Sequence, residues 1–260
     1  MRSSRPLYSA LAPSYAEHFE VPHRRAYDTL AWEYVRGMLP ERGPIIDAGC
    51  GVGRWTGRLL GMGYEVIGIE QAPGMIAELR QAAFGPGFTL IEESMETADL
   101  PGESAGMVLA LGSLQYASNP AATLRRFAGW VRPGGAVVAL VDSLVALVIE
   151  LLRDGRPAEA VQRTRTRTGR WSVAGHDAEM HLLDRERLRR MFQAAGLRDV
   201  ELRGLMAGAA ALGREQLREH LQRDWNGHLD LERQLSSHPV LADIGKQLLA
   251  TGRRPADAGH

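Results

Sequence analysis

The sequence predicts an α/β fold in which a mostly parallel sheet carries helices on both faces. Short runs rich in β-branched and other apolar residues alternate with helical patterns through most of the first two-thirds of the 260 residues, an alternation typical of a parallel sheet covered by helices. Apolar residues make up 45% of the chain and charged residues 24%. That composition predicts a globular protein with one sizeable core, elaborated by insertions.

Seven runs are expected to form the strands. The first ends in Asp47 and is followed by a glycine-rich turn, the fifth follows the turn RPGG, and the sixth alternates apolar and polar residues. The seventh is an apolar run that leads into a polar tail. The expected strands are residues 44–47, 65–70, 88–91, 106–111, a run ending near residue 142, residues 198–205, and a run within residues 246–255.

Four helices are expected between these strands, at residues 54–62, 74–83, 120–131 and 184–196. Glycine closes the first, and Asn119 is available to cap the third. The fourth, LDRERLRRMFQAAG, combines an N-cap residue, a periodic apolar face and a glycine stop. The helical periods thus fall between the strand runs, as crossover connections require.

The remaining segments predict a lid around the carboxyl edge of the sheet. We expect a helical lid segment at residues 1–43, a core half at residues 44–142, a substrate-cap insertion at residues 143–182, and the second core half at residues 183–260. The last contains a further helical insertion at residues 206–245. Insertions in such folds lie over the edge where ligands bind.

Charge and cysteine content restrict the partners. Lys plus Arg equals Asp plus Glu at 31 each, so no global field favours nucleic acid or an anionic membrane. Cys50 is the one cysteine, which excludes an intrachain disulfide and gives no metal-ligand spacing. No apolar run has the length of a membrane span. These observations predict a soluble, cytoplasmic protein that binds neither metal nor membrane, with nucleic acid disfavoured.

The stretch PIIDAGCGVG carries the first functional signal. Glycines at positions 49, 51 and 53 follow a buried strand and precede a helix, so bare backbone N–H groups meet the positive end of a helix dipole. The dinucleotide fingerprint G-x-G-x-x-G would need a third glycine where Arg54 stands. The spacing G-x-G-x-G therefore disfavours an oxidoreductase.

This loop and the motifs after it resemble the class I S-adenosylmethionine-dependent methyltransferases. The matching stretches are IIDAGCGVG, then VIGIEQAPGMIAELR, then MVLALGSLQYASNPAATLRRFAGWVRPGGAVVAL. The start, YSALAPSYAEHF, is similar to that of small-molecule members, including ubiquinone- and menaquinone-biosynthesis-like enzymes. Residues 8–142 carry most of the resemblance, and residues 183–205 and 246–254 a weaker part. It implies a Rossmann-like seven-stranded sheet with the last strand antiparallel, and S-adenosylmethionine as cofactor.

The resemblance also implies roles for residues. The glycine loop would face the methionyl part of the cofactor, Glu70 would bind the ribose, and Asp47 would organise the loop or reach the ammonium group. Where the family commonly has an acid for the adenine, this chain has Ser94 and Met95. The full expected cofactor set is Tyr15, Asp47, Gly49, Cys50, Gly51, Gly53, Glu70, Gln71, Ser94, Met95, Leu111 and Gly112.

Candidates for acceptor contact or proton transfer come from several segments. His23 and Tyr116 are preferred, although Pro22 is expected to break the helix before His23 and turn that side chain elsewhere. Other candidates are His18, Tyr27, Ser113, Gln115, Asp142, Ser143, Trp171, His176 and His181.

Three functions stay open. The first is methyl transfer to a small organic acceptor, which the size of the insertions favours. The second is methylation of RNA or a peptide, with the run QRTRTRTGR as the grip. The third is a non-catalytic partner protein that binds S-adenosylmethionine. The apolar run LVALVIELL would serve core or lid packing, an acceptor pocket, or the interface of a homodimer.

Overall fold

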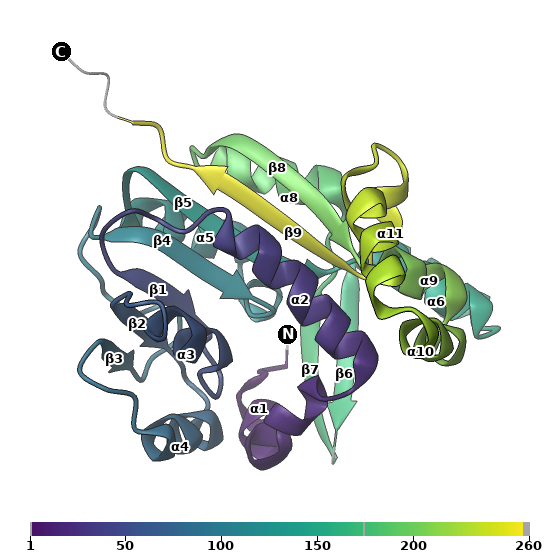
Figure 1. The fold of residues 1–260 in the computed structure, drawn as a ribbon, viewed down its shortest axis with the longest axis horizontal. Coiled ribbons are helices and arrows are strands. Elements are labelled where there is room, and N and C mark those ends of the chain that lie inside the picture. Colours follow the sequence, from purple (N-terminus) through teal and green to yellow (C-terminus); the bar gives the residue numbers. More distant parts are fainter. Residues whose placement is uncertain (1, 174, 257–260) are drawn as a thin grey trace.

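A computed structural model describes residues 2–173 and 175–256 and contains a seven-stranded mixed sheet (Figure 1). The strand order is β3–β2–β1–β4–β5–β9–β8, with parallel pairing from β3 to β5 and antiparallel pairing of β9 to both neighbours. The predicted sheet and its antiparallel last strand are confirmed. The strands are β1 Ile45–Ala48, β2 Val66–Ile69, β3 Phe88–Ile91, β4 Ala105–Leu111, β5 Val131–Asp142, β8 Arg198–Leu205 and β9 Gln247–Arg253.

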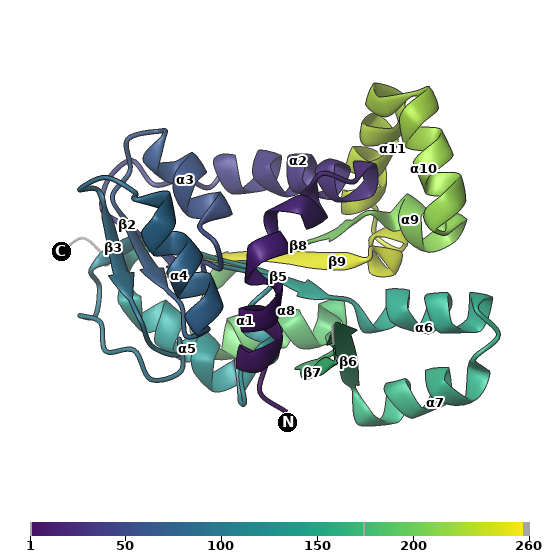
Figure 2. The ribbon, with the colours of Figure 1, turned by 90° about the horizontal axis from the view of Figure 1, so that it is seen from below.

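Helices cover both faces of this sheet, and the central strands feed two cores. Alternate residues point to opposite faces of a strand, so Ile45 packs with helices α2 (Pro22–Arg36) and α3 (Arg54–Leu60). Its neighbour Ile46 packs with helices α5 (Pro120–Trp130) and α8 (Arg185–Ala194). Figure 2 shows these two layers on either side of the sheet. Burial on both faces explains why the central strands are continuously apolar.

The helix signals in the sequence are confirmed at their caps. Asn119 Oδ1 accepts a hydrogen bond from the backbone N–H of Ala122 at 3.1 Å and starts α5. Asp184 Oδ1 accepts a hydrogen bond from the backbone N–H of Arg187 at 2.7 Å and starts α8. The second expected helix, at residues 74–83, is α4 (Pro73–Ala82), which follows β2. Each cap satisfies a backbone donor that the first helical turn leaves without a partner.

The N-terminal segment consists of α1 (Arg5–Leu11), two short 3₁₀ helices, Ala12–Ser14 and Ala16–Phe19, and then α2. Pro22 is the first residue of α2, a position where its missing N–H costs nothing. The chain is therefore interrupted before Pro22, as expected. His23, however, does not turn away, because it lies in the first turn of α2 and lines the same cavity as His18.

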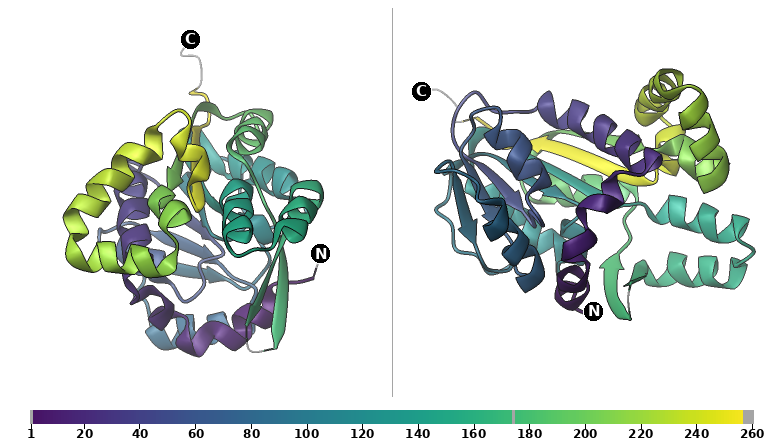
Figure 3. Two further views of the ribbon diagram at one scale, coloured as in Figure 1. Left: turned by 90° about the vertical axis from the view of Figure 1, so that its right-hand side faces the viewer. Right: turned by 60° about the horizontal axis from the view of Figure 1, so that its bottom comes forward.

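Two insertions extend beyond the sheet. Helices α6 (Leu144–Arg153) and α7 (Pro157–Thr166) lie side by side and project outward, as Figures 2 and 3 show. They lead into a hairpin of β6 (Thr168–Val173) and β7 (His176–His181), which the sequence analysis does not anticipate. Helices α9 (Ala207–Leu212), α10 (Arg214–Arg223) and α11 (Trp225–Ser237) form the second insertion. None of the described helices is both long and apolar enough to cross a membrane.

The strand order creates a switch point between β1 and β4. From β1 the chain moves outward through β2 and β3, and then returns to place β4 on the other side of β1. The loops after β1 and β4 therefore diverge to opposite faces and leave a crevice at the carboxyl edge. Ligands bind at this position in open α/β sheets.

Phe127 provides a test of the α5 core. Its side chain is fully buried and lies 5.4 Å, ring centre to ring centre, from Trp130. We expect Phe127→Ala to lower the free energy of unfolding by about 3–5 kcal/mol, because it removes buried apolar surface and leaves a cavity. Leu152→Ala, at an exposed position of α6, should change it by less than about 0.5 kcal/mol. Urea unfolding followed by circular dichroism measures both, and equal effects would contradict this core assignment.

Candidate functional site

The glycine loop lies between the end of β1 and the start of α3. Gly49, Gly51 and Gly53 have positive φ angles of 80°, 59° and 83°, which side-chain-bearing residues rarely adopt. A Cβ atom on Gly49 would lie 2.4 Å from Cβ of Ser113, so the loop also approaches the end of β4 too closely for a side chain. The loop thus presents bare backbone to the cavity beside it.

Glu70 follows β2 and ties its tip to the glycine loop. One carboxylate oxygen accepts a hydrogen bond from the Gly51 N–H at 3.0 Å, and the other accepts from the N–H groups of Gln71 and Ala72, both at 2.8 Å. The side chain is nearly buried, and burial raises the pKa of Glu70 although these hydrogen bonds oppose the shift. The carboxylate is therefore held in one orientation by backbone on both sides.

Three residues of the expected cofactor set do not line the small cavity: Asp47 and Gly53 pack against other protein groups, and Cys50 lines the larger cavity. Asp47 is buried, accepts a hydrogen bond from Thr56 Oγ1 at 2.8 Å, and lines neither cavity described below. A Cβ on Gly53 would lie 2.5 Å from the ring of Phe84, so Gly53 also faces protein. Cys50 lines the larger cavity, but burial raises the pKa of its thiol well above the ordinary value and keeps the thiol protonated.

A small cavity of about 80 Å³ lies over the tips of β1, β2 and β4. It has the position that the resemblance assigns to the ribose and adenine. The expected cofactor residues that line it are Tyr15, Gly49, Gly51, Glu70, Gln71, Ser94, Met95, Leu111 and Gly112. The structure therefore brings most of the expected set together, from four separate strand ends and the N-terminal segment.

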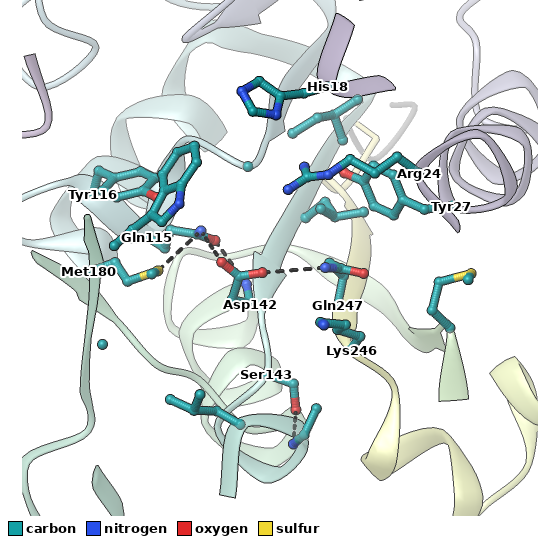
Figure 4. A pocket seen from close by; sticks show the side chains of 18 of the residues that line it. His18, Arg24, Tyr27, Gln115, Tyr116, Asp142, Ser143, Met180, Lys246 and Gln247 are labelled. Atoms are coloured by element: carbon teal, nitrogen blue, oxygen red, sulfur yellow. Dashed lines mark hydrogen bonds between the residues drawn. The ribbon is translucent and has the colours of Figure 1, made fainter. Parts of the chain in front are cut away.

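A larger cavity of about 480 Å³ adjoins the small one, and both predicted catalytic residues line it. Figure 4 shows its polar centre, with side chains converging from α2, β5 and β9. The two insertions contribute Leu147, Met180 and Ala209. The residues shared by the two cavities are Tyr8, Tyr15, Gly49, Gly51, Leu111, Gly112 and Tyr116.

Asp142 occupies the centre of the larger cavity, at the carboxyl end of β5. Gln115 Nε2 donates to Asp142 Oδ2 at 2.8 Å, and Gln247 Nε2 donates to Oδ1 at 3.5 Å (Figure 4). Gln115 also accepts from the Asp142 backbone N–H at 2.9 Å. Burial raises the pKa of Asp142. The antiparallel register places Gln247 directly opposite Asp142.

Aromatic rings form one wall where the cavities meet. Tyr8 makes edge-to-face contacts with Tyr15, Tyr116 and Trp171, at ring-centre distances of 6.1, 5.4 and 5.7 Å. Burial raises the pKa of Tyr116 far above its ordinary value. Tyr116 therefore keeps its proton at neutral pH and can orient a ligand by donating a hydrogen bond, but it is a poor base.

Other candidates lie at or outside this cavity. His18, His23, Tyr27, Ser143 and Trp171 line it, whereas His176 and His181 do not. Sequence reasoning missed Tyr8, Arg24 and Gln247. Tyr8 lies in a segment already considered, but no local signal indicates that Arg24 or Gln247 reaches the site.

Comparison with known proteins agrees with this geometry. A family model described as a methyltransferase domain matches residues 46–139. A ubiquinone biosynthesis O-methyltransferase of Xanthomonas axonopodis pv. citri (strain 306) is 28% identical over 114 residues, which cover 42% of this chain and 48% of that protein. A trans-aconitate 2-methyltransferase of Methylobacterium nodulans is 30% identical over 169 residues, covering 63% and 62%. The chain thus matches only part of the length of these relatives.

Solved structures share the fold over nearly the whole chain. A Haloferax volcanii methyltransferase in complex with a methyltransferase activator has a TM-score of 0.64 at 17% identity, covering 98% of this chain and 99% of that one. The CcbJ methyltransferase from Streptomyces caelestis has a TM-score of 0.62 at 17% identity, covering 95% and 96%.

The sheet order, the glycine loop and the acid after β2 define a Rossmann-like nucleotide-binding protein of the methyltransferase type. Residues 46–139 match a methyltransferase domain, and the chain is similar to the class I S-adenosylmethionine-dependent methyltransferases, whose cofactor is S-adenosylmethionine.

Glu70→Ala tests the cofactor side of the site. We expect the affinity for S-adenosylhomocysteine to fall roughly 10- to 150-fold, because hydrogen bonds to a charged group contribute about 1.5–3 kcal/mol. Isothermal titration calorimetry measures the change. Glu65→Ala is the matched control, since Glu65 is exposed and precedes the opposite end of the same strand. Unchanged affinity in Glu70→Ala would remove Glu70 from the site.

Asp47→Asn tests the buried acid. Burial raises the pKa of Asp47 from 3.8 to about 6 in the folded protein. The unfolded chain therefore releases this proton at lower pH, and Asp47 lowers the free energy of unfolding as pH rises from about 4 to about 6. Asparagine can still accept the hydrogen bond from Thr56 and does not titrate. The free energy of unfolding of the variant, relative to that of wild type, should therefore rise by roughly 3 kcal/mol at most from pH 4 to pH 7. A constant difference across this range in urea unfolding would contradict the shift.

Proposed function

We propose that this protein transfers the methyl group of S-adenosylmethionine to a small organic acceptor bound in the larger cavity. The observation that carries the proposal is the junction of the two cavities. They meet at the glycine loop, the end of β4 and Tyr116. A cofactor that spans the small cavity would therefore direct its reactive end toward the lid-covered space.

The chain's own residues fit the cofactor. Gly49 and Gly51 line the small cavity without a side chain to obstruct it, and Glu70 retains acceptor capacity for ribose hydroxyls because its backbone bonds do not use all of its lone pairs. Leu111 and Gly112, at the end of β4, border both cavities. These groups suit a ligand that is positively charged at one end and bears a sugar at the other.

When bound, S-adenosylmethionine would supply an activated methyl carbon: the acceptor lone pair would form a bond to that carbon in line with the carbon–sulfur bond, which breaks and leaves S-adenosylhomocysteine as a neutral thioether. The protein's contribution is mainly positioning and exclusion of water. Tyr116 and Gln115 line this cavity and would orient the acceptor, and His23 or Asp142 would receive a proton that the acceptor loses. Tyr8 and Trp171 close the space from the side of α1 and the hairpin.

The relatives are consistent with a small acceptor, since their names refer to ubiquinone biosynthesis and trans-aconitate. A macromolecular acceptor has less support. The arginine run lies largely in helix α7, where Arg163 binds Glu159 at 2.9 Å and Arg167 is paired with Asp184. These side chains are used within the protein rather than presented to a polyanion.

Calorimetry and an acceptor screen test the proposal. We expect the purified protein to bind S-adenosylhomocysteine, and to convert S-adenosylmethionine to it when a suitable small acceptor is present, as detected by mass spectrometry. RNA or peptide should not support turnover. Failure to bind S-adenosylhomocysteine would refute the proposal, and binding without turnover on any acceptor would favour the non-catalytic partner protein instead.

A further inference from the structure

The basic residues around the larger cavity differ in their pairing. Lys246 lies 3.5 Å from Glu150, and Arg54 lies 2.6 Å from Asp28. Arg156 and Arg170 are also ion-paired, with Glu159 and Asp177. Arg24 is the exception, because within residues 2–173 and 175–256 its guanidinium makes no ion pair or hydrogen bond and only approaches the Phe19 ring, at 5.7 Å.

The acidic residues around the cavity also differ in whether they form ion pairs. Glu150 is paired with Lys246, and Asp154 lies 3.9 Å from Arg153. Asp142 has no ion pair within the described part of the chain, and its oxygens accept only from amide groups. The cavity therefore holds one acid and one base that lack ionic partners.

These two groups face the same space without contacting each other. Arg24 reaches in from α2, and Asp142 lies at the end of β5, with the carboxylate turned toward the open centre (Figure 4). Burial raises the pKa of Asp142, and Arg24 is close enough to oppose that shift in part but does not form an ion pair with Asp142. Charged groups in a partly buried cavity are costly unless compensated. A ligand that contacts both would compensate them.

We propose that the acceptor carries a carboxylate, bound by Arg24, and a hydroxyl or amino group that donates a hydrogen bond to Asp142. The planar guanidinium suits a carboxylate because it can donate two parallel hydrogen bonds. Tyr8, Trp171 and Met180 in the wall accommodate an apolar body between the two polar ends. Arg24 lines the larger cavity and not the small one, which assigns the carboxylate to the acceptor. This inference rests on the proposed function.

Three probes separate the two recognition groups. With the protein saturated in S-adenosylhomocysteine, calorimetry compares 3-hydroxybenzoate, 3-hydroxybenzamide and benzoate. We expect wild type to bind 3-hydroxybenzoate about tenfold or more tightly than either of the others, as one charge-assisted hydrogen bond provides. Arg24→Met should abolish the preference for carboxylate over amide, and Asp142→Ala, which removes the acceptor oxygens, should abolish the preference for the hydroxyl. Each variant should retain the preference that depends on the other residue.

Arg25→Met is the matched control, because Arg25 is exposed on α2, lies over the Trp225 ring and does not line the cavity. It should keep both preferences. The inference would be overturned if wild type did not bind 3-hydroxybenzoate, or did not prefer it to the other probes. It would equally be overturned if Arg24→Met weakened S-adenosylhomocysteine binding tenfold and left the carboxylate preference intact, since Arg24 would then serve the cofactor. Failure of the proposed function itself is distinguishable, because wild type would then not bind S-adenosylhomocysteine.

Discussion

The register of the parallel strands is the constraint on which the site depends. Ile45 of β1 is aligned with Val66 of β2 and Met107 of β4, so the three strands end at one edge of the sheet. A slip of one residue would exchange the side chains of the two cores, and burial on both faces prevents it. The glycine loop and Glu70 consequently meet at that edge, where the hydrogen bond from Gly51 joins them. The site is thus a product of core packing.

Much of this framework could be predicted from the sequence because its signals are local. Continuous apolar runs indicate strands buried on both faces, as β4 is, and side-chain caps mark the helix starts at Asn119 and Asp184. The spacing of the glycines and the acid at Glu70 identifies the cofactor edge. Each of these features lies within one strand, loop or turn, so no knowledge of distant contacts is required.

The rest depends on contacts between distant segments, and the sequence carries no comparable signal for them. The β6–β7 hairpin has a polar, irregular sequence, and it is fixed partly by the N-terminus, where Arg2 binds Asp177. Helix α1 approaches α4 so closely that a Cβ on Gly74 would lie 2.3 Å from the Ser9 carbonyl. Gln247 reaches Asp142 only through the antiparallel register of β9. These tertiary contacts determine the acceptor side of the site, which is why its residues were the harder ones to predict.

The acids at the carboxyl edge also explain why a positively charged ligand suits this site. Burial raises the pKa values of Asp47, Glu70 and Asp142, and none of the three forms an ion pair within the described part of the chain. Negative charge is therefore held at this edge at an energetic cost, which a nearby cation would reduce. A sulfonium carries such a charge, whereas the thioether left after methyl transfer does not. On the proposed function, the charge at this edge would therefore favour the methyl donor over its product.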